Sequence, residues 1–145
     1  MSSLFEKDHI RINVNADDYE DAIKKVGQIL VDTNSITENY IESMIDSVKK
    51  LGPYIVIAPG FALAHARPSE AVLKDDISIM TLEKPVCFNS INDPVYVVMC
   101  LAAKSNDTHI NFMQKVATIL MQENTIENLK KASSIEEIQK IFEVE

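Results

Sequence analysis

Hydrophobic and polar positions alternate with a period of two in some segments of the chain and recur every three to four residues in others. Alternation and short, unbroken apolar runs predict strands. The strands expected on this basis are 9–14, 54–58, a continuation that starts at 61, 77–82 and 95–103. The last of these is apolar throughout and rich in valine, which is typical of a central strand covered on both faces.

The longer period predicts amphipathic helices, whose ends carry recognisable capping residues. They are expected to run from Asp17 or Asp18 to Asn34, from Thr37 to Gly52, from about 109 to 122, and onward from the capping box Ser134–Glu137. Two helices thus separate the first two strands, whereas residues 77–103 contain no helical stretch. This order predicts an α/β fold, a three-layer α/β/α sandwich with a mixed β-sheet.

Chain length and composition predict a globular protein with its own core. The 145 residues are 46% hydrophobic and 25% charged, which is ordinary for a soluble protein. No internal repeat or linker interrupts the pattern, so we expect residues 1–145 to form a single domain. Cys87 and Cys100 have no metal-ligand spacing, and Cys100 lies in an apolar run. We therefore expect Cys100 to be a small core residue of a reduced, cytoplasmic protein.

The charge balance and the hydropathy exclude several classes of partner. A net charge of −8 argues against nucleic acid, because that binding depends on Lys and Arg, and against adhesion to an anionic membrane. The N-terminus has no basic segment followed by an apolar one, so no export signal is expected. The longest apolar run, 94–103, is about half of a bilayer span, which argues against direct membrane insertion. Other proteins are the expected partners.

The segment 52–68 carries the clearest chemical signal in the chain. An apolar run ends in His65, and Arg67 follows two residues later. Neutral histidine is a competent nucleophile near pH 7, and a guanidinium is a good partner for phosphoryl oxygens. The small residues Ala62, Ala64 and Ala66 are expected to leave room for an approaching partner. This combination predicts a phosphohistidine site.

His109 is the second candidate site residue. It is expected in the first turn of a helix that follows the central strand and a loop rich in capping residues. Ligands in open α/β sheets gather beyond such strand ends, which predicts that His109 lies opposite His65. The helix N-terminus attracts anions, disfavours the imidazolium form and is expected to leave amides near His109 unsatisfied. His9, at the first strand, is expected to be structural or exposed.

Several segments resemble one known family. They are GPYIVIAPG at 52–60, ALAHARP at 62–68, LEKPVCF at 82–88, NDPV at 92–95 and LAAKSNDTHI at 101–110. Together they are similar to the EIIA domains of the mannitol/fructose type (EIIA type-2) of the phosphotransferase system (PTS), and most similar to the ascorbate-specific branch. The resemblance covers most of the chain and includes both His65 and His109.

The resemblance implies a function and a set of partners. His65 would accept a phosphoryl group from phospho-HPr and pass it to a cysteine of EIIB. Membrane EIIC would then couple uptake and phosphorylation of a carbohydrate, expected to be ascorbate, with another pentose-like or hexitol substrate left open. His109 would orient the imidazole of His65 or stabilise the phosphoryl group. The protein would thus be a cytoplasmic phosphotransferase component with the mixed α/β/α fold, without a metal or organic cofactor. Whether it forms a homo-oligomer stays open.

The chain departs from the family pattern at three places. Ala64 stands where the family usually has proline, which predicts a looser approach to His65. An arginine of many relatives is absent from the preceding helix, where this chain has Ser47, Lys49 and Lys50, so Arg67 is the expected phosphoryl contact. Mannitol-type members carry an acidic residue in place of Pro59, which favours the ascorbate branch.

Two other functions compete with the carrier. A PTS-like regulatory domain would accept phosphate on its histidine and signal to a partner protein, and the missing proline favours it. A metal-dependent hydrolase would use His65 and His109 as ligands, but a third ligand with suitable spacing is not visible in the sequence. For phosphotransfer, one ring nitrogen of His65 must be bare and the opposite N–H needs a fixed acceptor, which we expect to be a backbone carbonyl.

Overall fold

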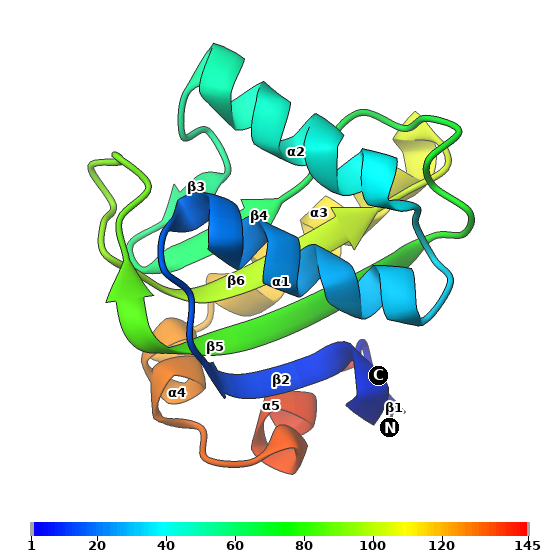
Figure 1. Ribbon diagram of the computed structural model, residues 1–145. Coiled ribbons are helices and arrows are strands. Elements are labelled where there is room, and N and C mark those ends of the chain that lie inside the picture. Colours follow the sequence, from blue (N-terminus) through cyan, green and yellow to red (C-terminus); the bar gives the residue numbers. More distant parts are fainter. Residues whose placement is uncertain (1, 145) are drawn as a thin grey trace.

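The computed structural model describes residues 2–144 and contains a five-stranded mixed sheet between two layers of helices (Figure 1). The strands are β1 (Ser2–Ser3), β2 (Ile10–Val14), β3 (Val56–Ala58), β4 (Phe61–Ala64), β5 (Asp76–Val86), β6 (Val95–Ala102) and β7 (Glu143–Val144). The helices are α1 (Tyr19–Asp32), α2 (Glu38–Leu51), α3 (Asn106–Leu120), α4 (Thr125–Lys131) and α5 (Ile135–Ile141), with a 3-10 turn, η1, at Lys7–His9. The predicted α/β/α sandwich is confirmed.

The strand order is β2-β5-β6-β4-β3, and the two ends of the chain pair separately as β1 and β7. Strand β2 is parallel to β5, and β4 is parallel to β6, whereas β5–β6 and β3–β4 are antiparallel. Helices α1 and α2 cover one face of the sheet, and α3, α4 and α5 cover the other (Figure 1). The sheet is therefore mixed, as predicted, and β6 is its central strand.

The core has two halves, one on each face of the sheet, because side chains alternate along β4 and β6. On the α1–α2 side, these strands contribute Ala62, Ala64, Val98, Cys100 and Ala102. On the α3–α5 side, they contribute Phe61, Leu63, Val97, Met99 and Leu101. The side chains in both halves are buried, so the unbroken apolar run of β6 is explained by burial on two faces. Cys100 is buried within this core, as predicted.

Most helix ends lie where capping residues predicted them. The side chain of Asp18 accepts a hydrogen bond from the Asp21 N–H at the start of α1, and Ser134 caps α5 in the same way. Helix α3, however, begins at Asn106, three residues before its predicted start, because Ser105 is its N-cap. The short helix α4 was missed, since its seven residues are too few to show a helical period.

A buried hydroxyl joins α2 to the ends of β4 and β6. Tyr40 is 1% exposed, and its hydroxyl accepts a hydrogen bond from the Ala66 N–H at 3.0 Å. The same hydroxyl donates to the carbonyl of Leu101 in β6, at 2.7 Å. Burial raises the pKa of Tyr40, so the hydroxyl keeps the proton that it donates. Tyr40 therefore fixes the chain just beyond His65 to the end of the central strand.

We predict that Tyr40→Phe lowers the free energy of unfolding by about 1–3 kcal/mol, because it leaves the buried Ala66 N–H and Leu101 carbonyl without their partner. Urea denaturation followed by circular dichroism measures the change. Tyr19→Phe is the matched control: the Tyr19 hydroxyl has no hydrogen-bond partner among residues 2–144, and we expect a change within about 0.5 kcal/mol. Equal losses in the two variants would contradict the role given to Tyr40.

Candidate active site

His65 directly follows β4, and strand alternation directs its side chain to the same face as Leu63, toward α3. Its Nδ1 lies 2.7 Å from the backbone carbonyl oxygen of Leu63. A carbonyl can only accept, so Nδ1 carries the proton and donates it. In the neutral ring, the lone pair is consequently on Nε2. The backbone carbonyl expected from the sequence is thus that of Leu63.

The imidazole of His65 is half-buried, and its surroundings favour the neutral form. Burial lowers the pKa of His65, and the nearby His109 lowers it further, against an opposite effect of the Leu63 carbonyl. The net shift is downward from 6.5, so the ring is uncharged at neutral pH. An uncharged ring with Nδ1 protonated presents a bare Nε2, which is the form that can act as a nucleophile.

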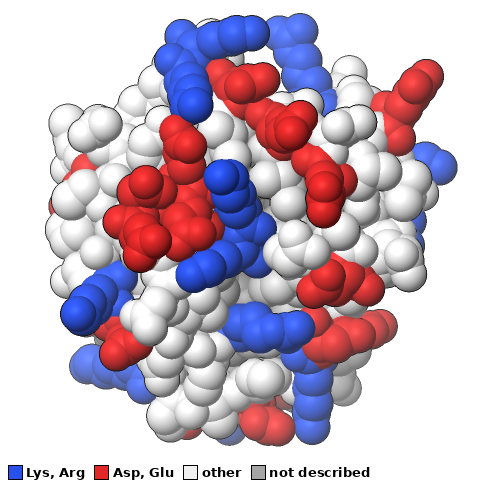
Figure 2. All heavy atoms as spheres, in the orientation of Figure 1, with Lys and Arg blue, Asp and Glu red and all other residues white. Residues whose placement is uncertain are grey.

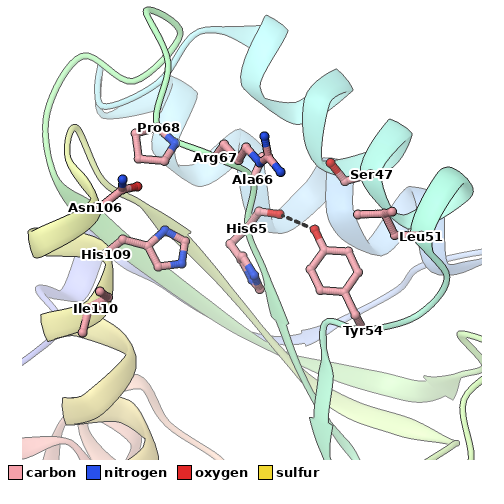
Figure 3. Close-up of a pocket in the computed structure, with 10 residues that line it drawn as sticks. All are labelled: Ser47, Leu51, Tyr54, His65, Ala66, Arg67, Pro68, Asn106, His109 and Ile110. Atoms are coloured by element: carbon pink, nitrogen blue, oxygen red, sulfur yellow. Dashed lines mark hydrogen bonds between the residues drawn. The ribbon is translucent and has the colours of Figure 1, made fainter.

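His109 lies in the first turn of α3, beside His65 (Figure 3). The centroids of the two rings are 5.2 Å apart, and their planes are nearly perpendicular. Burial lowers the pKa of His109, so this ring is neutral as well. The backbone N–H of the neighbouring Thr108 donates to the Ser105 hydroxyl at 3.2 Å, so the expectation that amides near His109 are unsatisfied is wrong for Thr108.

The two histidines meet because of the sheet topology. Ala64 pairs with Cys100 in the parallel β4–β6 ladder, so these strands end at the same edge of the sheet. Beyond β6, the carboxylate of Asp75 holds the loop before α3: it accepts from the Lys104 N–H at 2.6 Å and from the Thr108 hydroxyl at 3.2 Å. The loop before α3 and the first turn of α3, which carries His109, are therefore fixed to the residue before β5. Ala64 also remains within β4, so the strand runs to His65 without the proline of the family.

Tyr54 flanks the other side of His65 and was missed by the sequence analysis. Its ring lies 5.3 Å from the imidazole in an edge-to-face arrangement, and its hydroxyl donates to the backbone carbonyl of His65 at 3.3 Å (Figure 3). The ring of His65 is thus between Tyr54 and His109. The only signal in the sequence was that Tyr54 belongs to the same apolar segment as the histidine.

Both histidines line an open cavity of about 450 Å³ (Figure 3). Its other lining residues come from α2, from the segments on either side of β3 and β4, and from α3: Ser47, Leu51, Tyr54, Ala66, Arg67, Pro68, Asn106 and Ile110. Leu51 and Ile110 are 74% and 53% exposed at its rim. The cavity is therefore open to another protein, and apolar side chains border it.

Arg67 lines the same cavity, but its side chain is exposed and points elsewhere. Figure 3 shows the guanidinium directed toward Ser47 and α2, away from the imidazole of His109. A contact between Arg67 and a group on His65 thus requires the Arg67 side chain to rotate. Arg67 is near the histidine pair, but it is not part of it in this conformation.

The alanines around His65 are buried, whereas the sequence suggested that they would leave open space beside it. Ala62 and Ala64 are fully buried, and Ala66 is 6% exposed. All three belong to the core between the sheet and the α1–α2 layer. The expectation that they leave room for a partner is wrong for Ala62 and Ala64, whose small size lets the two helices pack closely on the sheet. Ala66, by contrast, also lines the cavity.

His9 is structural, one of the two alternatives expected. It is 7% exposed, and its Nε2 lies 2.7 Å from a carboxylate oxygen of Asp76, while Nδ1 lies 2.6 Å from Asp8. Burial lowers the pKa of His9, but hydrogen bonds and charges from Asp76 and Asp8 outweigh burial and raise it above 6.5. The charged ring therefore ties η1 to the start of β5, outside the cavity of His65.

Comparison with known proteins identifies the family. Residues 3–144 match the model of the "phosphoenolpyruvate-dependent sugar phosphotransferase system, EIIA 2" family. The mannitol-specific cryptic phosphotransferase enzyme IIA component of Escherichia coli K12 is 36% identical over 142 residues, which cover 98% of this chain and 97% of that protein. The ascorbate-specific PTS system EIIA component of the same organism is 34% identical over 139 residues, with 94% and 90% covered.

A solved structure agrees with these sequence matches. The solution structure of the mannitol-specific cryptic enzyme IIA of Escherichia coli superimposes with a TM-score of 0.86 at 35% identity, covering 96% of this chain and 95% of that one. The chain belongs to the EIIA type-2 family and is a component of the sugar phosphotransferase system. The fold and the family predicted from the sequence are confirmed.

Surface charge and hydropathy are consistent with this family. On the face formed by α1 and α2, acidic and basic side chains are interspersed, and the basic ones do not form a continuous stripe (Figure 2). This face therefore lacks the electrostatic footprint of a nucleic-acid interface. Within residues 2–144, none of the helices has the length and apolar character needed to cross a bilayer.

We predict that His65 is neutral and protonated on Nδ1 at pH of about 7.5, because the Leu63 carbonyl accepts that proton and burial disfavours the cation. Nitrogen-15 NMR of labelled histidines reports the tautomer, and titration should give a midpoint below 6.5. In His109→Gln, the midpoint of His65 should rise, since His109 lowers the pKa of His65. A ring protonated on Nε2, or an unchanged midpoint in the variant, would contradict this electrostatic picture.

Proposed function

We propose that the protein is a histidine phosphocarrier, which accepts a phosphoryl group on Nε2 of His65 from phospho-HPr and passes it to the cysteine of an EIIB partner. The observation that carries the proposal is the hydrogen bond from Nδ1 to the Leu63 carbonyl, at 2.7 Å. It leaves Nε2 as the nucleophilic atom of a half-buried neutral ring. Membership of the EIIA family supports the place of the protein within the phosphotransferase system.

The two transfer steps use the same nitrogen. In the first, the Nε2 lone pair of His65 attacks phosphorus, a new N–P bond forms, and the N–P bond to the histidine of phospho-HPr breaks. In the second, the thiolate of the EIIB cysteine attacks phosphorus and the bond to Nε2 breaks. His65 keeps its Nδ1 proton throughout, held by Leu63, so the ring returns to the neutral form. Catalysis in such a transfer is mostly positioning and placement of donors.

The phosphoryl oxygens need hydrogen-bond donors, and the cavity offers modest ones. The ring of His109 is 5.2 Å from that of His65, close enough to reach a group on Nε2. Arg67 is long and exposed, and rotation of its side chain would bring the guanidinium over the cavity. A carrier must release its group to the next protein, so a neutral imidazole and a mobile cation suit it better than a rigid cationic clamp.

We predict that His65→Ala abolishes phosphorylation by phospho-HPr, because it removes the bare Nε2 that the Leu63 carbonyl leaves as the attacking atom. His109→Gln should remain phosphorylatable but slower, by about ten- to hundredfold, since its amide can still donate to the phosphoryl group but is not held in the position of the His109 ring. Phosphorus-32 transfer from phospho-HPr, followed on gels, measures both. Labelling of the His65→Ala protein at the wild-type rate would contradict the assignment.

Onward transfer separates a carrier from a regulator. A carrier should deliver its phosphoryl group to a purified EIIB within the time in which it is loaded, whereas a regulatory domain would be loaded and would then hand the group on poorly. Metal analysis of the same purified protein tests the hydrolase alternative, because stoichiometric zinc bound by His65 and His109 would block Nε2. Loading without delivery to any EIIB would overturn the carrier role.

We further propose that the carbohydrate is ascorbate. Pro59 and the ALAHARP segment resemble the ascorbate-specific branch, while the identities to the mannitol-specific cryptic and ascorbate-specific relatives, 36% and 34%, are nearly equal. We predict that phosphorylated protein transfers to the EIIB of an ascorbate system at least about tenfold more efficiently, in kcat/KM, than to the EIIB of a mannitol system. The reverse preference would reject ascorbate while leaving the carrier role intact.

A further inference from the structure

Met113, which has had no role so far, is within hydrogen-bond distance of the histidine pair. Nε2 of His109 lies 3.1 Å from the sulfur of Met113, one turn further along α3. A thioether sulfur has no proton and can only accept, so this contact is a hydrogen bond when Nε2 of His109 carries the proton. Met113 therefore favours one of the two neutral forms of His109, with the lone pair on Nδ1.

We propose that Met113 is a positioning residue for His109, holding its imidazole in the Nε2–H form in the resting protein and releasing that N–H to the phosphoryl group once it is on His65. The release step rests on the proposed function, whereas the hydrogen bond between His109 and Met113 does not depend on it. Because His109 is neutral, only one of its nitrogens can donate at a time, so the tautomer decides whether a donor is ready.

A thioether is suited to this role because it is a weak acceptor. It is sufficient to select a tautomer and to fix the ring on the face of α3 that His109 and Met113 share as an i, i+4 pair. The charged oxygens of a phosphoryl group are far stronger acceptors, so the N–H exchanges sulfur for oxygen readily. A strong acceptor at position 113 would keep the N–H instead and compete with the phosphoryl group.

Two substitutions separate the chemistry of sulfur from its volume. Met113→Leu keeps an apolar side chain of similar size and removes the acceptor, and such exchanges are well tolerated. Met113→Gln keeps an acceptor on a chain of similar length but makes it stronger. Met121→Leu is the matched control, because Met121 is 85% exposed at the end of α3 and lies outside the residues that line the histidine cavity.

Nitrogen-15 NMR of the unphosphorylated proteins, above the pKa of His109, tests the hydrogen bond alone. In the wild type, the two ring nitrogens of His109 should show well-separated shifts, with Nε2 protonated. In Met113→Leu, the shifts should approach each other as the second tautomer becomes populated, whereas Met113→Gln and Met121→Leu should retain the separation. Wild-type shifts in Met113→Leu would overturn the role of the sulfur.

The rate of phosphoryl transfer to EIIB tests the release step. We expect Met113→Leu to be about two- to tenfold slower, the range that one neutral hydrogen bond is worth. Met113→Gln should also be slower despite its correct tautomer, because its stronger acceptor retains the N–H, and Met121→Leu should match the wild type. Wild-type rates in both Met113 variants would overturn the release step. If His65 is not phosphorylated at all, the proposed function fails together with the release step, whereas the NMR shifts still decide the hydrogen bond.

Discussion

The hydrogen bond from His65 Nδ1 to the Leu63 carbonyl is the interaction on which the chemistry of this site depends. It joins a side chain to the backbone of its own strand, two residues earlier, so the orientation of the ring is set by the strand and not by a mobile partner. Because the acceptor is a carbonyl, it selects one tautomer and leaves Nε2 bare. Burial and the neighbouring His109 keep the ring neutral. The backbone geometry at the end of β4 thereby determines that Nε2 is the nucleophilic nitrogen of His65.

The site also requires His109 to lie beside His65, and the fold brings the two rings together. Two parallel strands, β4 and β6, end at one edge of the sheet, and each is followed by a histidine. Tyr40 bonds to Ala66, beyond β4, and to Leu101, near the end of β6, and Asp75 holds the loop before α3. These contacts come from α2 and from the start of β5, so the pair of rings is assembled by four separate segments of the chain. Such a site is preorganised for a reaction that consists largely of positioning.

The sequence predicted the layers, the central strand and the two candidate histidines, because periodicity, capping residues and a local motif are all short-range signals. The short helix α4 and the pairing of β1 with β7 were not predictable in this way, since one is too brief to show a period and the other joins opposite ends of the chain. Within the site, the sequence predicted that a backbone carbonyl accepts the proton of His65, but it did not show that this carbonyl belongs to Leu63. Tyr54 and Tyr40 are placed by contacts with residues 11 and 26 positions further along the chain, which local spacing does not encode. Met113 is one helical turn from His109, but spacing alone does not show that its sulfur contacts the imidazole. Ala62 and Ala64 were misread because small size fits both an open approach and a close-packed core.

The most direct test is to phosphorylate nitrogen-15-labelled protein with phospho-HPr and to observe which nitrogen is coupled to phosphorus-31. If the Leu63 carbonyl determines the nucleophile, the coupling appears on Nε2 of His65, and Nδ1 of the same ring still carries its proton. Coupling to Nδ1 of His65, or to a nitrogen of His109, would mean that this hydrogen bond does not select the reacting atom.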